Sequence, residues 1–488
     1  MIGNASDTLL YAARPAVVAR HAGQLAVLLA GLSLVPVLVA LVAGEYSSAM
    51  RYVVVAIALA LAGAWLARRE APDTVQVNEA MVIGMLAFIA TPLAMTWPLM
   101  ASGIGFGDAL FECISGITTT GLSTLGTVEG MPVSFLFERA WLQWLGGLGI
   151  VVLSVALLSG SELASRRLVE SPVSPETLDT STRTYARRSF FVYVSLTLGA
   201  IALLWLAGWP AVDAVLLALA AISTGGFAPH DVSLAASPLW SARWAVIVVA
   251  LVGALPLLLY HSALRRQWKT LFRDPELRLL ALLGMAMTVL LALLMAYRDG
   301  EWSLEHAARA AIMALSAQTT SGFAVVAPVD LGHAAMLVLI VAMAVGGSVG
   351  STAGGIKLLR MVLLLRVARL IVRRTAMPQH AVTPLRLRGN RVSMEDLTGA
   401  LFVVLLFVAT VVLSWLPFLA AGYDPLRSLF EVVSAVGTVG LSAGVTGPGL
   451  PDGLKAVLCV DMLMGRVEFI AMLVMLYPRT WFGRRRST

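Results

Sequence analysis

Long apolar stretches, separated by short polar or glycine-rich segments, follow one another along almost the whole chain. Several reach the roughly 20 residues that a helix needs to cross a hydrocarbon core about 30 Å thick. Examples are residues 24–43, 52–67, 334–345 with its continuation, and 397–421. The first of these runs is longer than the apolar part of a signal peptide, so we expect a retained helix. The pattern predicts a membrane protein that crosses the bilayer many times.

Four shorter apolar runs each end in a threonine, any residue and a glycine, and they recur at a period of about 100 residues. They read FECISGITTTGLS, LLALAAISTGGFA, AIMALSAQTTSGF and FEVVSAVGTVGLS. Six positions before each glycine stands a small residue, and an apolar residue follows each glycine; these are Ser115, Ala220, Ser316 and Ser434, and Leu122, Phe227, Phe323 and Leu441. About ten helical residues rise only about 15 Å, so each run must enter the membrane and return on the same side.

Each repeat therefore contains a spanning helix, a re-entrant half-helix with its loop, and a second spanning helix. Asp424 and Pro425 suit the N-cap and the first position of the fourth half-helix. We predict an all-α multi-pass membrane protein with four pseudo-symmetric helix–pore loop–helix repeats around one pore. Two extra N-terminal helices bring the total to ten spanning helices and four half-helices. The predicted units are a helix pair at 1–70 and pore repeats at 71–180, 181–275, 276–390 and 391–488.

The four loops have the chemistry of a cation filter. Non-helical backbone at membrane depth is tolerated only where it is buried in protein or lines a watery cavity. A half-helix that enters from outside points the negative end of its dipole toward the membrane centre, which favours a cation. Glycine allows backbone angles that other residues avoid, so carbonyl oxygens can face an axis and replace the hydration shell of an ion. For a single loop a polar turn or a small-residue helix contact is the alternative, but four loops in register favour a filter.

We therefore predict a selectivity filter for a small monovalent cation, with K+ as the expected ion. The filter residues are Thr119, Thr120, Gly121, Thr224, Gly225, Gly226, Thr320, Ser321, Gly322, Thr438, Val439 and Gly440. K+ is expected at the threonine and the glycine of each loop: Thr119, Gly121, Thr224, Gly226, Thr320, Gly322, Thr438 and Gly440.

Composition and charge agree with a membrane protein. Of 488 residues, 59% are hydrophobic and 13% are charged, whereas soluble domains are nearer half apolar and a quarter charged. The net charge is +7, and most of the lysine and arginine lies in six segments that we predict to be cytoplasmic: 1–23, 68–79, 160–188, 263–280, 357–391 and 479–488. This positive-inside bias places both termini in the cytoplasm.

The basic clusters are therefore interpreted as topology signals and contacts with lipid headgroups. No basic domain with interleaved aromatic residues is present, so nucleic-acid binding is not expected. Cys113 and Cys459 are too few for a disulfide framework or a metal cluster.

Longer motifs give the chain a family resemblance. They are DALFECISGITTTG at the first filter loop, LQWLGGLGIVVLS at 142–154, STGGFAPHD at 223–231, GGSVGSTAGGIK at 346–357 and MLMGRVEF at 462–469. With them the chain, from about residue 75 to its end, resembles the TrkH/KtrB/HKT superfamily of potassium transporters, nearest the TrkH branch, which has the same extra N-terminal helix pair. The resemblance implies that Gly121, Gly226, Gly322 and Gly440 are the filter glycines. It also associates glycine in the first loop with a preference for potassium over sodium. The fourth loop, GTVGLSAG, is looser than in many members, and its filter boundaries stay open.

Five glycines within 346–355 interrupt the expected second helix of the third repeat. Tight glycine-mediated helix packing is one interpretation, and the resemblance supports another, an intramembrane loop that gates the pore below the filter. The gating residues are then Gly346, Gly347, Gly350, Ser351, Thr352, Gly354, Gly355, Lys357 and Arg466. Lys357 also fits a snorkelling residue at the membrane interface.

Arg466 lies midway along the apolar run 455–477, where a charge is costly and needs a partner. Asp461 and Glu468 are the candidate partners. The resemblance implies that this arginine projects near the pore and tunes conduction.

Glu112 and Glu431 stand nine residues before a filter glycine. We expect them near the starts of their half-helices, where compensation of the helix dipole is favoured over direct attraction of cations. His230 and Asp231 follow the second filter loop and match a family pattern, but their chemistry alone assigns no role.

The predicted function is potassium uptake across the cytoplasmic (inner) membrane, with K+ as transported ion and no bound cofactor. The resemblance implies a homodimer with a pore in each subunit, regulated by a cytosolic nucleotide-binding ring protein of the TrkA type. The chain has no glycine-rich nucleotide motif after a strand, so any nucleotide control must come from that partner.

Three other functions were weighed. Enzymatic activity is not predicted, because the six histidines form no spacing such as H-E-x-x-H. A rocking transporter with inverted repeats is disfavoured, because the four repeats have parallel topology. A sodium-permeable protein, or a proton- or sodium-coupled symporter of the same family, stays open.

Overall fold

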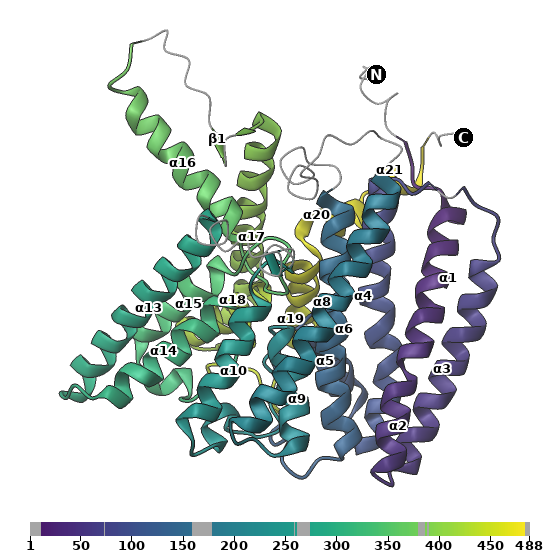
Figure 1. Ribbon diagram of the computed structural model, residues 1–488, viewed down its shortest axis with the longest axis horizontal. Coiled ribbons are helices and arrows are strands. Elements are labelled where there is room, and N and C mark those ends of the chain that lie inside the picture. Colours follow the sequence, from purple (N-terminus) through teal and green to yellow (C-terminus); the bar gives the residue numbers. More distant parts are fainter. Residues whose placement is uncertain are drawn as a thin grey trace.

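The computed structural model describes residues 11–72, 74–158, 178–257, 259–260, 274–378, 386–387 and 390–483. Helices form most of this part of the chain (Figure 1). The strands within it are one antiparallel pair of two residues each, β1 (Arg386–Leu387) and β2 (Asn390–Arg391). The prediction of an all-α multi-pass membrane protein is confirmed.

The N-terminal helices are α1 (Pro15–Leu32), α2 (Leu34–Val42) and α3 (Tyr46–Ala67). The helices α1 and α3 cross closely at Gly23 and Gly63, where a Cβ atom on either glycine would lie under 3.0 Å from the carbonyl oxygen of the other. Small residues let two helix backbones approach in this way within a membrane. The helix pair at the edge of the molecule therefore depends on two glycines.

The same order of elements then occurs four times. The first spanning helices are α4 (Val77–Leu99), α8 (Leu178–Leu206), α13 (Pro275–Asp299) and α17 (Met394–Ala420). The half-helices are α5 (Phe106–Ile117), α9 (Ala211–Ile222), α14 (Leu304–Gln318) and α18 (Pro425–Val436). The helices after the loops are α6 (Val133–Leu158), α10 (Trp240–Gly253), α15 (His333–Val345) and α19 (Asp452–Val467). The exact repeat boundaries remain a prediction.

Shorter elements connect these helices. Among the described residues, three 3-10 helices lie in the loops: η2 (Met100–Ser102), η4 (Ser233–Ala236) and η5 (Pro328–Leu331). After the second helices of the third and fourth quarters come α16 (Leu358–Arg374), α20 (Phe469–Leu476) and α21 (Pro478–Trp481). Figure 1 shows α16 extending away from the bundle of the other helices.

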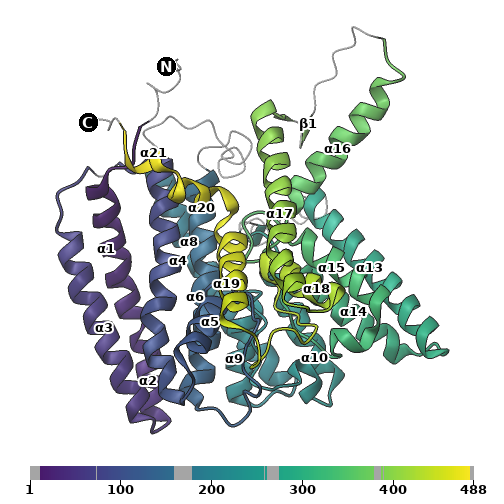
Figure 2. The ribbon, with the colours of Figure 1, turned by 180° about the vertical axis from the view of Figure 1, so that it is seen from behind.

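The half-helices have 12, 12, 15 and 12 residues, which corresponds to roughly 18–22 Å. They do not cross the full height of the bundle as α4 and α6 do (Figure 2). The predicted cap of the fourth is confirmed, because the Asp424 side chain accepts a hydrogen bond from the Arg427 N–H at 2.8 Å and Pro425 begins the helix. Ser303 caps α14 in the same way.

Seven helices, rather than the ten expected, are long and apolar enough to cross a membrane in the part of the chain that the structure describes. The other three positions hold α10, α15 and α19, with 14, 13 and 16 residues. The helix α10 ends at Gly253, α15 ends just before Gly346 with φ +69°, and α19 ends just before Glu468 with φ +64°. The ends of α10 and α19 lie close to the C-terminal ends of half-helices. A Cβ on Gly253 would clash with the Ile222 carbonyl oxygen, and one on Gly465 with that of Val436.

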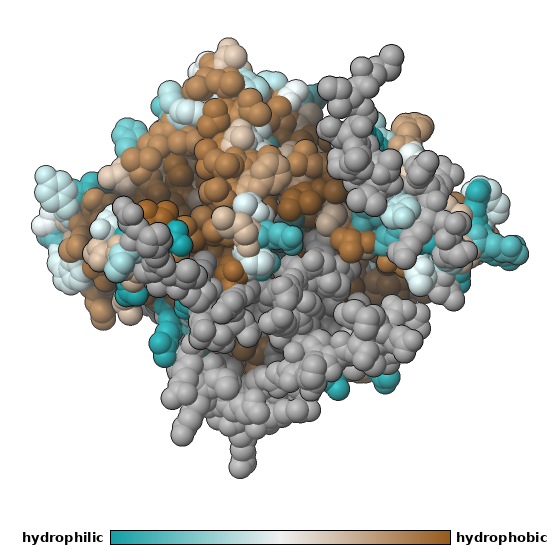
Figure 3. Space-filling model, turned by 90° about the horizontal axis from the view of Figure 1, so that it is seen from above, coloured by the Kyte–Doolittle hydropathy of each residue, from teal (hydrophilic) through white to brown (hydrophobic). Residues whose placement is uncertain are grey.

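Large apolar side chains are exposed along the outer faces of α3, α13 and α17, among them Ile57, Leu282 and Leu405 at 54%, 67% and 58%. Hydrophobic residues also make up much of the coloured surface seen from above (Figure 3). The apolar exposure along the outer faces of α3, α13 and α17 fits contact with lipid rather than water. The polar serine and threonine side chains of the four loops are instead buried in the middle of the protein.

The beginning and the end of the described chain lie on the same side of the bundle. The Ala13 N–H donates to the Thr480 carbonyl oxygen at 2.7 Å, which joins the start of α1 to α21. This arrangement is compatible with both termini on one side of the membrane, while the side itself remains a prediction.

Candidate selectivity filter and gate

Two residues after the end of each half-helix stands a threonine in the left-handed backbone region. The φ angles are +53° at Thr119, +53° at Thr224, +56° at Thr320 and +50° at Thr438. A β-branched residue rarely adopts this region, where glycine normally ends a helix. Strain of about 1–3 kcal/mol at each threonine is typical for such a conformation, and it marks a candidate functional site.

The hydrogen bonds around these threonines are the same in all four loops. Each threonine N–H bonds the carbonyl oxygen three residues back, and the next N–H bonds the carbonyl oxygen five residues back, at distances of 2.8–3.2 Å. This pairing satisfies carbonyl groups at the end of each half-helix. The predicted repeat thus corresponds to one local backbone structure, present four times.

The four filter glycines form a closed ring. A Cβ atom on Gly121 would lie under 3.0 Å from the Gly225 carbonyl oxygen, one on Gly226 from that of Ser321, one on Gly322 from that of Val439, and one on Gly440 from that of Thr120. Each glycine therefore touches the following loop, and the fourth touches the first. The φ angles of the glycines, from +69° to +93°, independently disfavour any side chain.

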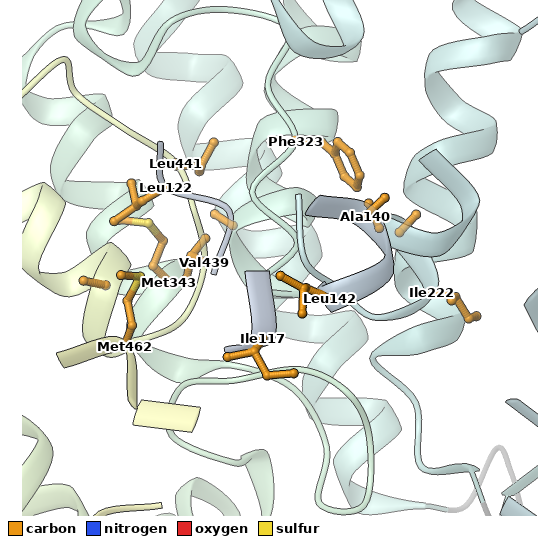
Figure 4. Packing of buried hydrophobic residues seen from close by; sticks show 14 of the residues in the cluster. Ile117, Leu122, Ala140, Leu142, Ile222, Phe323, Met343, Val439, Leu441 and Met462 are labelled. Atoms are coloured by element: carbon orange, nitrogen blue, oxygen red, sulfur yellow. The ribbon is translucent and has the colours of Figure 1, made fainter. Parts of the chain in front are cut away.

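The apolar residues that follow the glycines are buried in the surrounding protein. Leu122, Phe227, Phe323 and Leu441 are each at most 4% exposed. Figure 4 shows Leu122, Val439 and Leu441 near Met343 and Met462. Burial of these side chains fixes the backbone directly after each of the four glycines.

Serine hydroxyls and one glutamine support the loops. The Gly121 N–H donates to Ser115 Oγ and the Gly440 N–H to Ser434 Oγ, both at 3.0 Å. Gln143, fully buried on α6, donates to the Gly225 carbonyl oxygen and accepts from the Phe227 N–H at 3.2 Å. The sequence analysis did not single out Gln143. The only sign of its role in the sequence is that it places a polar amide within the apolar run 142–154.

Glu112 and Glu431 do not lie at half-helix starts, which corrects the expectation of dipole compensation. Each is the seventh residue of a 12-residue helix and is fully buried. Glu112 Oε1 accepts from Ser123 Oγ at 2.6 Å and from the Thr124 N–H at 3.1 Å, which ties the returning loop to the half-helix. Arg139 Nε pairs with Glu112 Oε2 at 2.8 Å, and its guanidinium lies 3.8 Å from the ring centre of Phe227.

Glu431 has the same role in the fourth loop. Its Oε1 accepts from Ser442 Oγ at 2.6 Å and from the Ala443 and Val445 N–H groups at 2.9 and 3.1 Å, and its Oε2 accepts from Thr446 Oγ1 at 2.8 Å. No arginine or lysine pairs with it among the described residues, so hydroxyl and backbone donors alone hold this carboxyl.

His230 and Asp231 join the outer loops of the first two quarters. Asp231 accepts from Thr127 Oγ1 at 2.6 Å and from the Val128 N–H at 2.7 Å. Burial disfavours the charge on Asp231, but these hydrogen bonds outweigh burial and lower its pKa. His230 Nε2 lies 2.9 Å from Asp213 Oδ2 at the start of α9. Asp231 and His230 therefore hold these outer loops in place, a role that the residue types alone did not assign.

The glycine-rich segment is a buried loop between α15 and α16, which confirms the expected interruption of the helix. Gly346, Gly350 and Gly355 have φ angles of +69°, +76° and +65°. A Cβ on Gly346 would lie under 3.0 Å from Gly354 and Gly355, and a Cβ on Gly347 would clash with Ala353, so the two ends of the loop touch.

This loop contacts the threonine end of the filter. The Gly354 N–H donates to Thr320 Oγ1 at 2.7 Å, and a Cβ on Gly354 would lie under 3.0 Å from Thr438 Oγ1. The Thr352 hydroxyl lies 3.0 Å from the Ile222 carbonyl oxygen at the end of α9. Ser351 Oγ instead bonds the Ser348 carbonyl oxygen within the loop at 2.6 Å. The loop therefore touches three of the four half-helix ends.

Lys357 and Arg466 fix the loop from its other side. Lys357 is 6% exposed, and its Nζ donates to the Ala353 carbonyl oxygen at 2.6 Å, which does not fit the snorkelling alternative. Arg466 donates from Nη1 to the Thr352 carbonyl oxygen at 2.6 Å and from Nη2 to that of Gly146 at 3.2 Å. The predicted gating residues are therefore neighbours in space.

The expected carboxylate partners of Arg466 are wrong. Asp461 faces α17, where its Oδ1 accepts from Ser414 Oγ at 2.6 Å. Glu468 pairs with Arg360 Nη2 at 2.5 Å. Arg466 is held by backbone carbonyl groups from α6 and from the loop, and side-chain spacing along one helix cannot reveal such partners.

Comparison with known proteins agrees with this architecture. The model of the TrkH family, described as a cation transport protein, matches residues 47–480. The Trk system potassium uptake protein TrkH of Salmonella typhimurium is 29% identical over 481 residues, which cover 95% of this chain and 99% of that protein. The Trk system potassium uptake protein TrkI of Halomonas elongata is 30% identical over 463 residues, with coverage of 92% and 93%.

The fold also matches a solved structure. The crystal structure of the potassium transporter TrkH from Vibrio parahaemolyticus superimposes with a TM-score of 0.85 at 26% identity, covering 96% of this chain and 99% of that one. The family match spans all four quarters of the chain, including the ring of glycines and the glycine-rich loop. The chain belongs to the TrkH family of cation transport proteins.

Proposed function

We propose that this protein takes up potassium across the cytoplasmic membrane through a filter formed by its four loops. The observation that carries the proposal is the ring in which each filter glycine contacts the carbonyl-bearing backbone of the next loop. A closed ring of four backbones surrounds one axis with equivalent carbonyl groups, which is the arrangement that replaces the hydration shell of K+. The relatives named as potassium uptake proteins support the same ion.

The electrostatics favour a cation at this place. The C-terminal ends of α5, α9, α14 and α18 converge on the loops, and each carries the negative end of a helix dipole. The hydroxyls of Thr119 and Thr438 are buried without a hydrogen-bond partner in the described structure. Buried hydroxyl oxygens are normally hydrogen-bonded, so these two oxygens at the threonine end of the filter are available to coordinate an ion.

We further propose that the loop 346–357 closes the pore at the threonine end of the filter. The loop bonds Thr320 through Gly354 and is held by Arg466 from α19. A segment with five glycines is poorly committed to a helix, so a change between seated and open arrangements requires little reorganisation of regular structure.

Regulation and assembly are proposed with the function. The two ends of the described chain lie on the side where α1 begins, and α16 extends from the bundle on that same side (Figure 1). We propose that this side is cytoplasmic, that a cytosolic nucleotide-binding ring protein of the TrkA type acts on the gate there, and that the protein is a homodimer with a pore in each subunit.

Proton coupling is the second candidate. Asp461 and Glu138 are buried carboxyl groups at 1% exposure, and each has one oxygen without a hydrogen-bond partner. Acidic groups inside the membrane commonly mark proton pathways. A sodium-permeable filter is the remaining alternative.

Reversal potentials of the purified protein in liposomes distinguish these candidates. Under crossed potassium, sodium and proton gradients, the reversal potential is expected to follow the potassium gradient alone. A potential that follows sodium would contradict potassium selectivity. A shift with the pH gradient at fixed potassium, removed by Asp461→Asn or Glu138→Gln, would favour coupled transport.

A further inference from the structure

The second filter loop differs from the others at two positions close to its glycine. In the first and fourth loops the N–H of the filter glycine donates to a serine six residues earlier, as Gly121 does to Ser115 at 3.0 Å. The second loop has Ala220 at that position. The residues directly before the four filter glycines are Thr120, Gly225, Ser321 and Val439. The second loop is therefore also the one in which this position has no side chain.

In the first and third loops the side chain directly before the filter glycine bonds within its own loop. Thr120 Oγ1 lies 2.8 Å from Thr118 Oγ1, and Ser321 Oγ accepts from Thr319 Oγ1 at 3.1 Å. Gly225 has no side chain with which to form such a bond. The second loop thus lacks two contacts that hydroxyl groups supply elsewhere in the ring, although its backbone has the same left-handed threonine and glycine.

Gln143 of α6 occupies the space beside Gly225. A Cβ atom on Gly225 would lie under 3.0 Å from Cγ, Cδ and Oε1 of Gln143, and these are its three nearest atoms. The φ angle of Gly225 is not positive, unlike that of Gly226, so the backbone conformation does not by itself require glycine at position 225. The position of the glutamine side chain therefore explains why this loop has a second glycine.

The amide of Gln143 bonds the backbone on both sides of Gly226. Its Nε2 donates to the Gly225 carbonyl oxygen, and its Oε1 accepts from the Phe227 N–H at 3.2 Å. Only this orientation of the amide serves both groups, because a carbonyl oxygen cannot donate. Of the four carbonyl groups directly before the filter glycines, that of Gly225 alone accepts a hydrogen bond from a side chain of the described residues. One side chain thus supports both neighbours of the filter glycine.

The helix that carries Gln143 packs tightly against the ends of two half-helices. A Cβ on Gly146 would clash with the Ile117 carbonyl oxygen at the end of α5, and a Cβ on Gly147 would lie 2.8 Å from Ser223 Cβ at the end of α9. Because α6 is fixed to both neighbours, Gln143 can hold the second loop at a defined distance from the first.

We propose that Gln143 is a positioning residue of the filter, which holds the second loop in the geometry that favours potassium over sodium. The inference rests on the proposed potassium filter. Without the amide, the Gly225 carbonyl and the Phe227 N–H would be left buried without their partner. The same carbonyl oxygen borders Gly121 in the ring, so its displacement would disturb the first loop as well. A relaxed ring can adapt its carbonyl groups to the smaller sodium ion.

The first experiment measures potassium-to-sodium permeability ratios from reversal potentials in liposomes. Gln143→Leu keeps the approximate size of the side chain and removes both hydrogen bonds, so the ratio is expected to fall about fivefold or more. Thr197→Val is the matched control, because it removes a buried hydrogen bond at 3.0 Å from the next residue of α6, Trp144, on the side of α8. Its ratio should stay at the wild-type value, whatever its effect on stability.

Gly121→Ser separates this proposal from the proposed function. If Gly121→Ser lowers the permeability ratio and Gln143→Leu leaves it unchanged, the filter stands and the role of Gln143 is overturned. If neither variant changes the ratio, the four-loop filter is contradicted together with the role of Gln143. A similar fall in Thr197→Val and Gln143→Leu would also overturn the proposal, because loosening of α6 in general would then explain both.

A second set of variants tests the direct contact and does not depend on the folding of Gln143→Leu. Gly225→Ser collides with Gln143, and Gln143→Ala removes the amide, so each is expected to lower the permeability ratio. In the double variant Gln143→Ala/Gly225→Ser the serine has room and can bond Ser223 Oγ, as Thr120 bonds Thr118 in the first loop. Its ratio is expected to recover to within about twofold of the wild type, because the two positions are coupled. A ratio above those of both single variants supports the proposal, and a ratio no higher than either overturns it.

Discussion

At the scale of single residues, the filter glycines leave no room for a side chain. Gly121 has φ +90°, and a Cβ there would lie under 3.0 Å from the Gly225 carbonyl oxygen. We expect Gly121→Ser to displace that carbonyl and to reduce the potassium-to-sodium permeability ratio about tenfold or more, which corresponds to about 1.4 kcal/mol. Reversal potentials under mixed potassium and sodium gradients provide the measurement.

The matched control is Gly130→Ser. Gly130 has a similar φ of +83° in an outer loop, but nothing lies within 4 Å of its Cβ position. It carries the same backbone strain without the contact to a neighbouring loop, so selectivity should stay at the wild-type value. Equal permeability ratios in both variants would remove Gly121 from the filter.

The buried pair of Arg139 and Glu112 gives a prediction about stability. Arg139→Met leaves the fully buried Glu112 carboxyl without its cation and removes the contact with Phe227. Loss of one partner of a buried pair typically costs about 3–5 kcal/mol. We expect a clearly lower unfolding temperature in detergent, followed by tryptophan fluorescence.

Arg309→Met is the control for this change, because Arg309 pairs with Glu305 at an exposed position. Exposed pairs contribute about 0–1 kcal/mol, so its unfolding temperature should stay close to that of the wild type. A similar drop in the unfolding temperature of both variants would show that the buried pair contributes no more to stability than the exposed pair.

At the scale of elements, the loop 346–357 and the filter share direct contacts. Gly354→Ala would place a Cβ under 3.0 Å from Thr438 Oγ1 and the Gly437 carbonyl oxygen, so the loop could not seat as it does. We expect potassium flux to rise about twofold, which corresponds to about 0.4 kcal/mol between the seated and the open loop, with unchanged permeability ratios. Tracer flux into liposomes measures the rise.

Gly449→Ala serves as the control, because nothing lies within 4 Å of its Cβ position. It should leave both flux and selectivity unaltered. If Gly354→Ala conducts like the wild type with and without the proposed cytosolic partner, the loop has only a packing role and the gate lies elsewhere.

Arg466 joins three elements, because it lies on α19 and bonds carbonyl groups of α6 and of the loop. Arg466→Ala frees the loop and removes a positive charge near the proposed cation path, where a low local dielectric amplifies its effect. We expect higher flux at unchanged selectivity. Loss of folded protein, seen by size-exclusion chromatography, without any gain in flux would assign Arg466 a structural role alone.

The elements also show which features a sequence reveals. The Thr-x-Gly repeat could be recognised from the sequence because one backbone motif, a left-handed threonine followed two residues later by a glycine with positive φ, occurs four times. The position of Glu112 was misjudged because α5 begins at Phe106, six residues before Glu112, which therefore lies in the middle of the helix. The partners of Arg466 were missed because they are backbone groups 114 and 320 residues away, and any residue type can supply a carbonyl.

At the scale of the whole molecule, contacts between successive quarters close the ring beyond the filter itself. Asp231 joins the first two outer loops, and the Leu234 N–H donates to the Ala324 carbonyl oxygen between the second and third quarters at 3.0 Å. Lys455 Nζ pairs with Asp108 Oδ1 at 2.8 Å and connects the fourth quarter to the first. The four loops of one chain therefore close the ring of contacts among themselves.

This closure predicts how mixed assemblies behave. A non-conducting variant is expected from Gly226→Val, because a side chain there would collide with the Ser321 carbonyl oxygen at φ +80°. If each subunit of the proposed homodimer has its own pore, co-expressed wild-type and variant chains should give flux in proportion to the wild-type fraction. Differently tagged chains, purified through both tags, yield defined mixed dimers, and tracer flux per dimer should be half that of the wild type. Flux near zero in these mixed dimers would contradict one pore per chain, because only a pore shared by both subunits is blocked by a single defective copy.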